Sequence, residues 1–380
     1  MWRHIYSNNL MTVKQHGFRK RFNTTTQLLH VTYGATTALN NKKNHHIVSF
    51  DFSKAFDKVP HNLLIHKLRQ YKFSGEVLLW IAAWLRNRTS KVVVNGNYSM
   101  SFGNSSGVPQ GSVLGPLLFL LYVNDLPGGV LSDCRLYADD TLLCCDVEHP
   151  NDDRLQRDVS ALESWSKKWQ MPFNNRKCLH MQVGRQTPDF NLFLNNESIS
   201  TTTEIKYLGI TLSEDMKWNV HVANTVKQAN KTLGMIRRCL QEANIKTKLL
   251  AFNTVVRPIL EYATQVWSPG EIGLSRSIEM IQRKAVKWVY RMNRRESIEL
   301  KMEAENVHTL AERRAQHDLL FLRKVEFGDY DIQLENYIKT NEFYDTRKGV
   351  ITTFKRINAY KNHFYNRMES EVKVLFPHSK

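Results

Sequence analysis

The hydrophobic pattern in the first half of the chain alternates between the period of strands and the period of helices. The mostly apolar segment 47–52 predicts a short β-strand that ends on a carboxylate, Asp51. Apolar residues at helical spacing follow over 60–71 and 75–86, and a glycine-rich loop then leads into an apolar helix. Strands and helices mixed in this way predict an α+β fold.

The acidic pair Asp139-Asp140 lies between two apolar flanks, which predicts a hairpin with the pair at its turn. A second hairpin is expected around Asn95-Gly96-Asn97, because Asn-Gly favours tight turns. An amphipathic helix is predicted over 152–169. Shorter strand patterns follow at 179–183, 192–194 and 204–212.

The period changes after Trp218. Apolar residues from Val222 to Leu240 alternate spacings of four and three, the pattern of a helix seam, and two further stripes follow over 249–260 and 278–289. Three such helices predict a helical bundle distinct from the α+β part. Residues 291–380 are charged and less regular, and residues 1–46 are polar, basic and unable to close a core alone.

Charge points to a polyanionic partner. The chain has 380 residues, a formal net charge of +17 and 42% apolar residues, which fits two or three folded domains. Nucleic acid is the commonest partner of so basic a protein, although acidic membranes and acidic proteins also bind basic surfaces. No signal-like core or stretch long enough to cross a membrane is present, so we expect an intracellular protein of the nucleus or cytoplasm, neither secreted nor membrane-bound. The five cysteines lack zinc spacing, so we expect reduced thiols and no zinc.

Asp51 and the pair Asp139-Asp140 are the residues best suited to chemistry. Two-metal phosphoryl transfer needs carboxylates from separate elements that converge on two ions about 4 Å apart. Carboxylate oxygens suit Mg²⁺, so we expect two Mg²⁺ ions, with Mn²⁺ as an alternative. An isolated Asp-Asp pair is more often a solvated turn, but the apolar flanks place this pair at the mouth of a buried sheet.

The loop 106–112 supplies a second candidate feature. Gly107 and Gly111 would let the backbone approach a substrate closely, and Gln110 could hydrogen-bond a base or a sugar. Taken alone, the same loop could be a plain glycine turn before a helix.

Ordered motifs connect these segments to a known family. The chain resembles the reverse transcriptases of non-LTR retrotransposons (LINE-type, jockey-like) over roughly residues 15–290. The matching segments are Gln15 to Arg19 with Thr26 to Leu29, Asp51 to His61, Ser106 to Pro116, Tyr137 to Asp140, Trp165 with Trp169 to Cys178, Tyr207 to Gly209, and Arg257 to Ala263 with Val266 to Pro269. The resemblance implies a right-hand polymerase palm with partial fingers and a helical thumb. It also implies an RNA template, a DNA primer and dNTPs as partners.

The resemblance implies roles for particular residues. Asp51, Asp139 and Asp140 would bind metal and catalyse the reaction, and Lys177 would protonate the departing pyrophosphate. Phe52 would contribute its backbone carbonyl, and Phe56 would block a ribose 2′-hydroxyl. Arg19 and Arg21 are candidates for binding the triphosphate, although simple surface charge explains them equally well. Gln110 and Gly111 would contact substrate.

The resemblance also sets the expected domains and the alternatives. We expect partial fingers over 1–46, a palm over 47–215, a thumb over 216–295 and a basic C-terminal extension over 296–380. Further fingers strands and an endonuclease domain would precede Gln15 in the family, so we expect an N-terminally truncated member. The main hypothesis is an RNA-directed DNA polymerase, and the alternative is an inactive relic that only binds nucleic acid. Phe56 argues against a third hypothesis, an RNA-dependent RNA polymerase.

The helical segment carries candidate residues for binding nucleic acid. Its cations lie on or beside the apolar stripes, so we expect them to face the backbone or minor groove of a duplex. They are Lys227, Lys231, Arg237, Arg238, Lys246 and Lys248.

Overall fold

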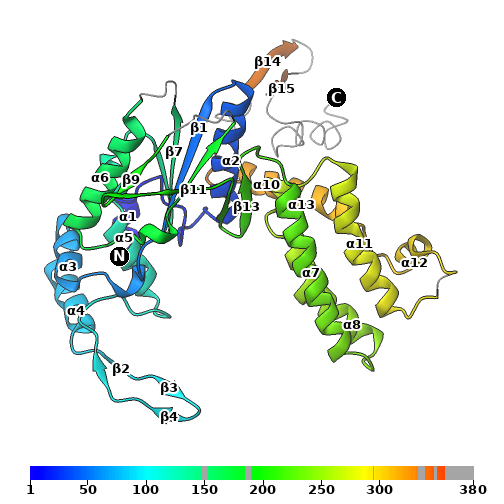
Figure 1. Ribbon diagram of the computed structural model, residues 1–380, viewed down its shortest axis with the longest axis horizontal. Coiled ribbons are helices and arrows are strands. Elements are labelled where there is room, and N and C mark those ends of the chain that lie inside the picture. Colours follow the sequence, from blue (N-terminus) through cyan, green and yellow to red (C-terminus); the bar gives the residue numbers. More distant parts are fainter. Residues whose placement is uncertain (148–151, 185–189, 294, 333–338, 346–348, 356–380) are drawn as a thin grey trace. The chain divides into compact units, whose positions relative to one another are not determined.

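The computed structural model describes residues 1–147, 152–184, 190–293, 295–332, 339–345 and 349–355 (Figure 1). The chain divides into two compact units. The first contains residues 1–27 and 42–205, and the second contains residues 28–41 and 206–380. Helix α2 (Thr24–Asn40) begins in the first unit and continues in the second.

A five-stranded sheet forms the centre of the first unit. Its strand order is β11 (Ser200–Thr201), β8 (Leu179–Val183), β1 (Asn44–Phe50), β7 (Asp140–Val147) and β6 (Asp133–Tyr137). Strand β1 runs antiparallel to both of its neighbours, and the short β11 runs parallel to β8. The predicted strand over 47–52 therefore starts earlier, at Asn44, and ends at Phe50, which leaves Asp51 just beyond the sheet.

Helices supply most of the core of the first unit. They are α3 (His61–Gln70), α4 (Gly75–Leu85), α5 (Leu114–Val123) and α6 (Arg154–Lys168). Helix α5 is apolar along its whole length, and all its residues from Leu117 to Val123 are buried. The predicted helices are confirmed here, and the side chains of all four pack with Val48 and Phe50 of β1 in one core cluster. In the described part of the chain, no helix is both long and apolar enough to cross a membrane.

Short elements complete the first unit. Strands β2 (Thr89–Ser90) and β5 (Phe102–Gly103) continue into the predicted hairpin of β3 (Val93–Val94) and β4 (Asn97–Tyr98), an arm that projects beyond α4 (Figure 1). The remaining elements are α1 (Trp2–Ser7), the 3₁₀ turns Ala55–Asp57, Leu126–Gly129 and Asn175–Lys177, and the hairpin of β9 (Phe193–Leu194) with β10 (Glu197–Ser198).

The second unit is largely helical. The three predicted stripes correspond to α7 (Asn219–Cys239), to α8 (Ile245–Ala251) with its continuation, and to α11 (Ile272–Val289). The continuation of α8 is a π-helix (Phe252–Val256), followed by α9 (Arg257–Glu261), which has Pro258 in its first turn. Strand β12 (Glu204–Tyr207) begins at the end of the first unit and forms a hairpin with β13 (Ile210–Ser213). The other elements of the second unit are α10 (Thr264–Trp267) and strands β14 (Lys339–Asp345) and β15 (Gly349–Lys355).

Two parts of the chain contain helices that the sequence did not predict. Helix α2 occupies much of the segment 1–46, which had no predicted element. Helices α12 (Ile298–Ala304) and α13 (Leu310–Glu326) occupy a segment expected to be irregular, and both pack against α11. Helix α13 begins with a capping box, in which the side chains of Thr309 and Glu312 each accept a hydrogen bond from the other's backbone N–H.

The cysteines differ sharply in exposure. Cys134, Cys144, Cys145 and Cys178 are buried in the first unit, whereas Cys239 is exposed at the end of α7 in the second. Burial raises the pKa of Cys134 to about 12 and that of Cys178 to about 11. All five are free thiols in the structure.

Candidate active site

Asp51, Asp139 and Asp140 lie at one end of the central strands. Asp51 follows the last residue of β1, which pairs with Thr141 of β7. Asp140 pairs with Tyr137 of β6, which leaves a turn of two residues that contains Asp139. The predicted hairpin is therefore confirmed, with Asp140 at the first position of β7. Neighbouring strands thus bring the three carboxyl groups to the same end of the sheet.

The three carboxyl groups repel one another. Burial raises the pKa of Asp140 to about 6, with further contributions from the charges of Asp139 and Asp51. Burial also raises the pKa of Asp139, and the charge of Asp51 adds to that shift. The side chain of Asp51 is 38% exposed, and Asp140 keeps an exposed surface. Carboxylates that crowd together beside open solvent favour the binding of a cation, because a cation removes the repulsion.

The donor set fits a hard divalent cation. Mg²⁺ is usually held by one or two carboxylates, with water and substrate phosphates as its remaining ligands. Within the described ranges, no group of three or more His, Cys, Asp or Glu side chains is arranged to hold a metal ion by itself. Carboxylates alone would leave positions on such an ion for water and substrate phosphates.

Lys177 lies beside Asp51. Its Nζ is 3.4 Å from Oδ2 of Asp51, and its side chain is 65% exposed. The segment around Phe173 fixes this neighbourhood, because Asn174 N–H donates to the carbonyl of Asp51 at 2.7 Å and Phe173 forms a β-bridge with Phe52. Lys177 is thus within reach of Asp51 and open to solvent.

The glycine-rich loop is fixed against the segment that follows Asp51. Val108 N–H donates to the carbonyl of Phe56 at 2.8 Å, and Gln110 Nε2 donates to Oδ1 of Asp57 at 3.0 Å. Gly107 has a φ of +90°, and a Cβ there would lie 2.7 Å from the carbonyl oxygen of Asp57. Gly111 also has a positive φ, of +79°, but nothing lies within 4 Å of its Cβ position. Gly107 is needed because a side chain there would clash with the backbone of Asp57. The backbone of Gly111, by contrast, has open space beside it.

Phe52 and Phe56 are both held by aromatic contacts. The ring of Phe52 is buried and stacks on Phe173 with 4.5 Å between centroids. Phe56 is half-buried and stacks on Phe119 of α5 with 4.4 Å between centroids. The exposed Phe18 approaches the edge of Phe56 at 6.5 Å. Phe56 is therefore a half-buried, supported ring, and its backbone carbonyl accepts the hydrogen bond from Val108 of the glycine-rich loop.

Arg19 and Arg21 differ in their contacts and in their exposure. Arg19 donates through Nη1 to the backbone carbonyls of Thr12 at 2.6 Å and Gln15 at 2.9 Å, and its guanidinium lies over the ring of Phe22. These contacts support the local backbone, and a role for Arg19 at the triphosphate remains a prediction. Arg21 is exposed, with a φ of +72°.

One buried residue near the aspartates had no predicted role. The sequence indicated Gln15 only as part of a motif, but its side chain accepts a hydrogen bond from the N–H of Ala138, next to Asp139. A buried amide that binds backbone of a distant segment leaves no periodic signal in the sequence.

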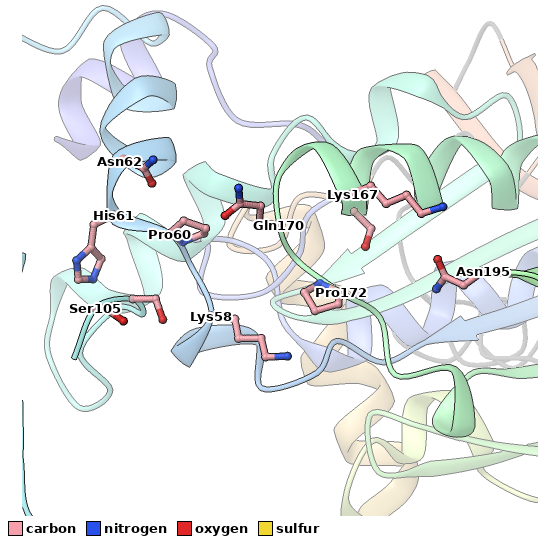
Figure 2. Close-up of a pocket in the computed structure, with 11 residues that line it drawn as sticks. Lys58, Pro60, His61, Asn62, Ser105, Lys167, Gln170, Pro172 and Asn195 are labelled. Atoms are coloured by element: carbon pink, nitrogen blue, oxygen red, sulfur yellow. The ribbon is translucent and has the colours of Figure 1, made fainter. Parts of the chain in front are cut away.

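Two neighbouring hollows lie beside the glycine-rich loop. One, of about 830 Å³, is lined by Lys58, Lys167 and Asn195 among others, with side chains from the start of α3 and the end of α6 (Figure 2). The other, of about 630 Å³, contains Gln110, and both are lined by His61. The lining of the first hollow has no carboxylate, which suits an anionic group better than a cationic one.

The cations of the second unit lie mostly at its surface. Lys227, Lys231, Arg237 and Arg238 are exposed on α7, and Lys246 is exposed on α8. The prediction for Lys248 is wrong, because this side chain is buried with its Nζ 5.5 Å from the ring centroid of Trp288. Its position on the inner face of a short helix accounts for the difference.

Comparison with protein families decides the classification. The model of the family described as reverse transcriptase (RNA-dependent DNA polymerase) matches residues 1–212, more than half of the chain. The chain belongs to the reverse transcriptase family. The matched segment includes the whole candidate active site and all five strands of its sheet. The predicted resemblance and the predicted α+β palm are therefore confirmed.

Individual reverse transcriptases show how far the similarity extends. The probable RNA-directed DNA polymerase from transposon BS of Drosophila melanogaster is 27% identical over 315 residues, which cover 76% of this chain and 34% of the relative. The RNA-directed DNA polymerase from mobile element jockey of the same fly is 28% identical, with 74% and 33% covered. The chain thus spans about a third of the length of these relatives. The structure of apo telomerase from Candida tropicalis matches with a TM-score of 0.44 and 13% identity, over 76% of this chain and 49% of that one.

Proposed function

We propose that this chain is an RNA-directed DNA polymerase that extends a DNA primer with dNTPs on an RNA template. The observation that carries the proposal is the convergence of Asp51, Asp139 and Asp140 at one end of the sheet, where burial and mutual repulsion raise the pKa values of the last two. Membership of the reverse transcriptase family supports it.

The reaction joins the primer 3′-oxygen to the α-phosphorus of the dNTP and breaks the bond from that phosphorus to pyrophosphate. Asp51, Asp139 and Asp140, with the backbone carbonyl of Phe52, would hold two Mg²⁺ or Mn²⁺ ions, which neutralise the attacking and leaving oxygens when bound. Lys177, which is exposed and lies beside Asp51, would donate a proton to the departing pyrophosphate.

Neighbouring residues would select and orient the nucleotide. The supported ring of Phe56 would exclude a ribose 2′-hydroxyl. The open backbone of Gly111 and the side chain of Gln110 would contact the templating base or its sugar. Arg21, which is exposed, and Arg19 would bind the triphosphate. The exposed cations of α7 would contact the phosphates of the primer–template duplex.

Substitution of Asp139 by asparagine tests the proposal. Asparagine keeps the shape of aspartate and removes a charge that is repelled by Asp51, so the melting temperature should hold or rise. Mg²⁺-dependent dNTP incorporation on a primed RNA template should fall by several powers of ten, since metal-mediated charge stabilisation contributes several kcal/mol. Asp153→Asn, which removes an exposed aspartate at the start of α6, is the matched control and should leave incorporation unchanged.

Two outcomes would contradict the proposal. If Asp139→Asn melts well below wild type and extends primers normally, the carboxylate is a structural turn residue. If folded wild-type protein binds primer–template in a salt-sensitive way but extends no primer with Mg²⁺ or Mn²⁺, the chain is the inactive nucleic-acid-binding relic instead.

A further inference from the structure

The side chain of Gln15 binds the turn that carries the aspartate pair. Gln15 is completely buried. Its Oε1 accepts hydrogen bonds from the N–H groups of Gly17 at 2.7 Å and Ala138 at 2.8 Å, and its Nε2 donates to the carbonyl of Ala138 at 3.3 Å. One amide therefore satisfies both the N–H and the carbonyl of the residue that precedes Asp139.

The turn needs such support, because its backbone is strained. Ala138 has a φ of +56°, a conformation that costs a residue with a Cβ about 1–2 kcal/mol. Ala138 is also buried, so its N–H and carbonyl would be costly to leave without partners. A strained backbone persists only where its surroundings fix it, and here Gln15 provides that restraint.

The chain around Gln15 is itself fixed against strand β6. Leu136 N–H donates to the carbonyl of Lys14 at 3.0 Å, and His16 N–H donates to the carbonyl of Leu136 at 2.9 Å. This segment therefore runs beside β6 like an additional strand, with a parallel bridge between Gln15 and Leu136.

Gly17 lets this segment approach the turn. A Cβ on Gly17 would lie 2.4 Å from the backbone nitrogen of Ala138, so only glycine permits the observed distance. Arg19 in turn holds the carbonyl of Gln15 through Nη1 at 2.9 Å. Gln15, Gly17 and Arg19 thus together support the turn.

We propose that Gln15 is a positioning residue, which holds the turn so that Asp139 and Asp140 present their carboxylates to a divalent cation. The inference rests on the proposed function, because it assigns Gln15 to the same site. It differs from a purely structural role in one respect: loss of Gln15 must weaken the response to the cation beyond any loss of stability.

The test compares Gln15→Met with Gln182→Met, a matched change at a buried glutamine of β8. Iron(II), with ascorbate and peroxide, replaces Mg²⁺ as a probe that cleaves the backbone beside its binding site, and fragments are mapped by mass spectrometry. Increasing Mg²⁺ competes with this cleavage, and the Mg²⁺ concentration that halves the cleavage is the half-point for Mg²⁺ binding. This measurement does not require polymerase activity. Primer extension against Mg²⁺ concentration gives a second half-point.

We expect wild type to be cleaved near residues 138–141, and Gln15→Met to need at least tenfold more Mg²⁺ in both measurements. Gln182→Met should lose stability but keep the wild-type half-points. If Gln15→Met does not fold, the same change is made with Ala138→Gly, since glycine accepts the positive φ without strain. Wild-type half-points in the folded Gln15 variant would overturn the positioning role.

Failure of the proposed function gives a different result. In that case wild type itself shows no cleavage at the turn and no extension. Wild-type cleavage and extension with an unaltered Gln15 variant would refute only the role of Gln15.

Discussion

A pair of histidines in the sheet should make the first unit sensitive to acid. His46 of β1 and His180 of β8 are both completely buried, and the distance from Nδ1 of His46 to Nε2 of His180 is 2.9 Å. Their rings stack with 5.1 Å between centroids, and Phe190 lies against both. Burial lowers the pKa of His46 to about 3, helped by His180 and His45, and burial lowers the pKa of His180 to about 4.

The sign of the effect follows from these pKa values. A histidine in the unfolded chain has a pKa of about 6.5, so between pH 6.5 and about 4 the unfolded chain binds protons that the folded chain does not. The free energy of unfolding is therefore unaffected above pH 7 and falls as the pH drops below 6.5. At pH 5 each histidine should cost about 2 kcal/mol, and the pair about 4 kcal/mol, a large part of the 5–15 kcal/mol that stabilises a typical domain.

The assay compares wild type with the double variant His46→Gln/His180→Gln, in which amides keep polar atoms but do not titrate. Hydrogen exchange of the amides in β1 and β8 measures opening of the sheet from pH 7.5 to pH 5, after correction for intrinsic exchange rates. Both proteins also contain His45 with its partner Asp146, and the buried His221 of the second unit. The contributions of these groups to the pH dependence therefore cancel in the comparison. His66→Gln, at an exposed position of α3, is the control.

We expect the wild-type sheet to lose about 4 kcal/mol more protection than the double variant over this range. An equal loss in both proteins would show that the buried pair is protonated in the folded state, and the reasoning would then be wrong. The His66 control should follow wild type.

Three further predictions concern the loop, the nucleotide and the duplex. Gly107→Ala should lower the free energy of unfolding by about 2 kcal/mol or more in chemical denaturation, because a Cβ would lie 2.7 Å from the carbonyl oxygen of Asp57. Gly96→Ala, with a φ of +81° but open space, is its control and should cost less. Phe56→Val should lower the ratio of kcat/KM for dNTPs over ribonucleotides, and an unchanged ratio would reject the steric role. Reversing the charges of Arg237 and Arg238 should reduce the magnitude of the slope of log affinity against log salt concentration by about one unit for each phosphate that the variant no longer neutralises. An unchanged slope would show that the duplex does not contact these two arginines.

Local patterns were enough to predict where the three aspartates lie, because they follow or begin strongly patterned strands. The apolar flanks of Asp139 and Asp140 predicted their hairpin, and the run before Asp51 predicted the strand that presents it. The actual end of that strand at Phe50 was not predicted, since strand ends depend on pairing with β7.

Features that depend on tertiary contacts were missed. Helix α2 carries several β-branched threonines, such as Thr36, whose hydroxyl bonds the carbonyl of Thr32, and it lacks a clear polar face. Helix α13 did have a readable start in its Thr309–Glu312 capping box. The histidine pair depends on the register of two strands far apart in the sequence, which no local pattern reveals.

The exposure of the cysteines offers a way to measure whether the first unit is folded. Cys239 is the one exposed thiol among five, so a thiol-reactive dye should label a single position at the end of α7 in the native protein. The four buried thiols all belong to the first unit, and each becomes reactive only when that unit opens. Counting the dyes attached per molecule, one or five, therefore reports whether the sheet that carries the aspartates is intact.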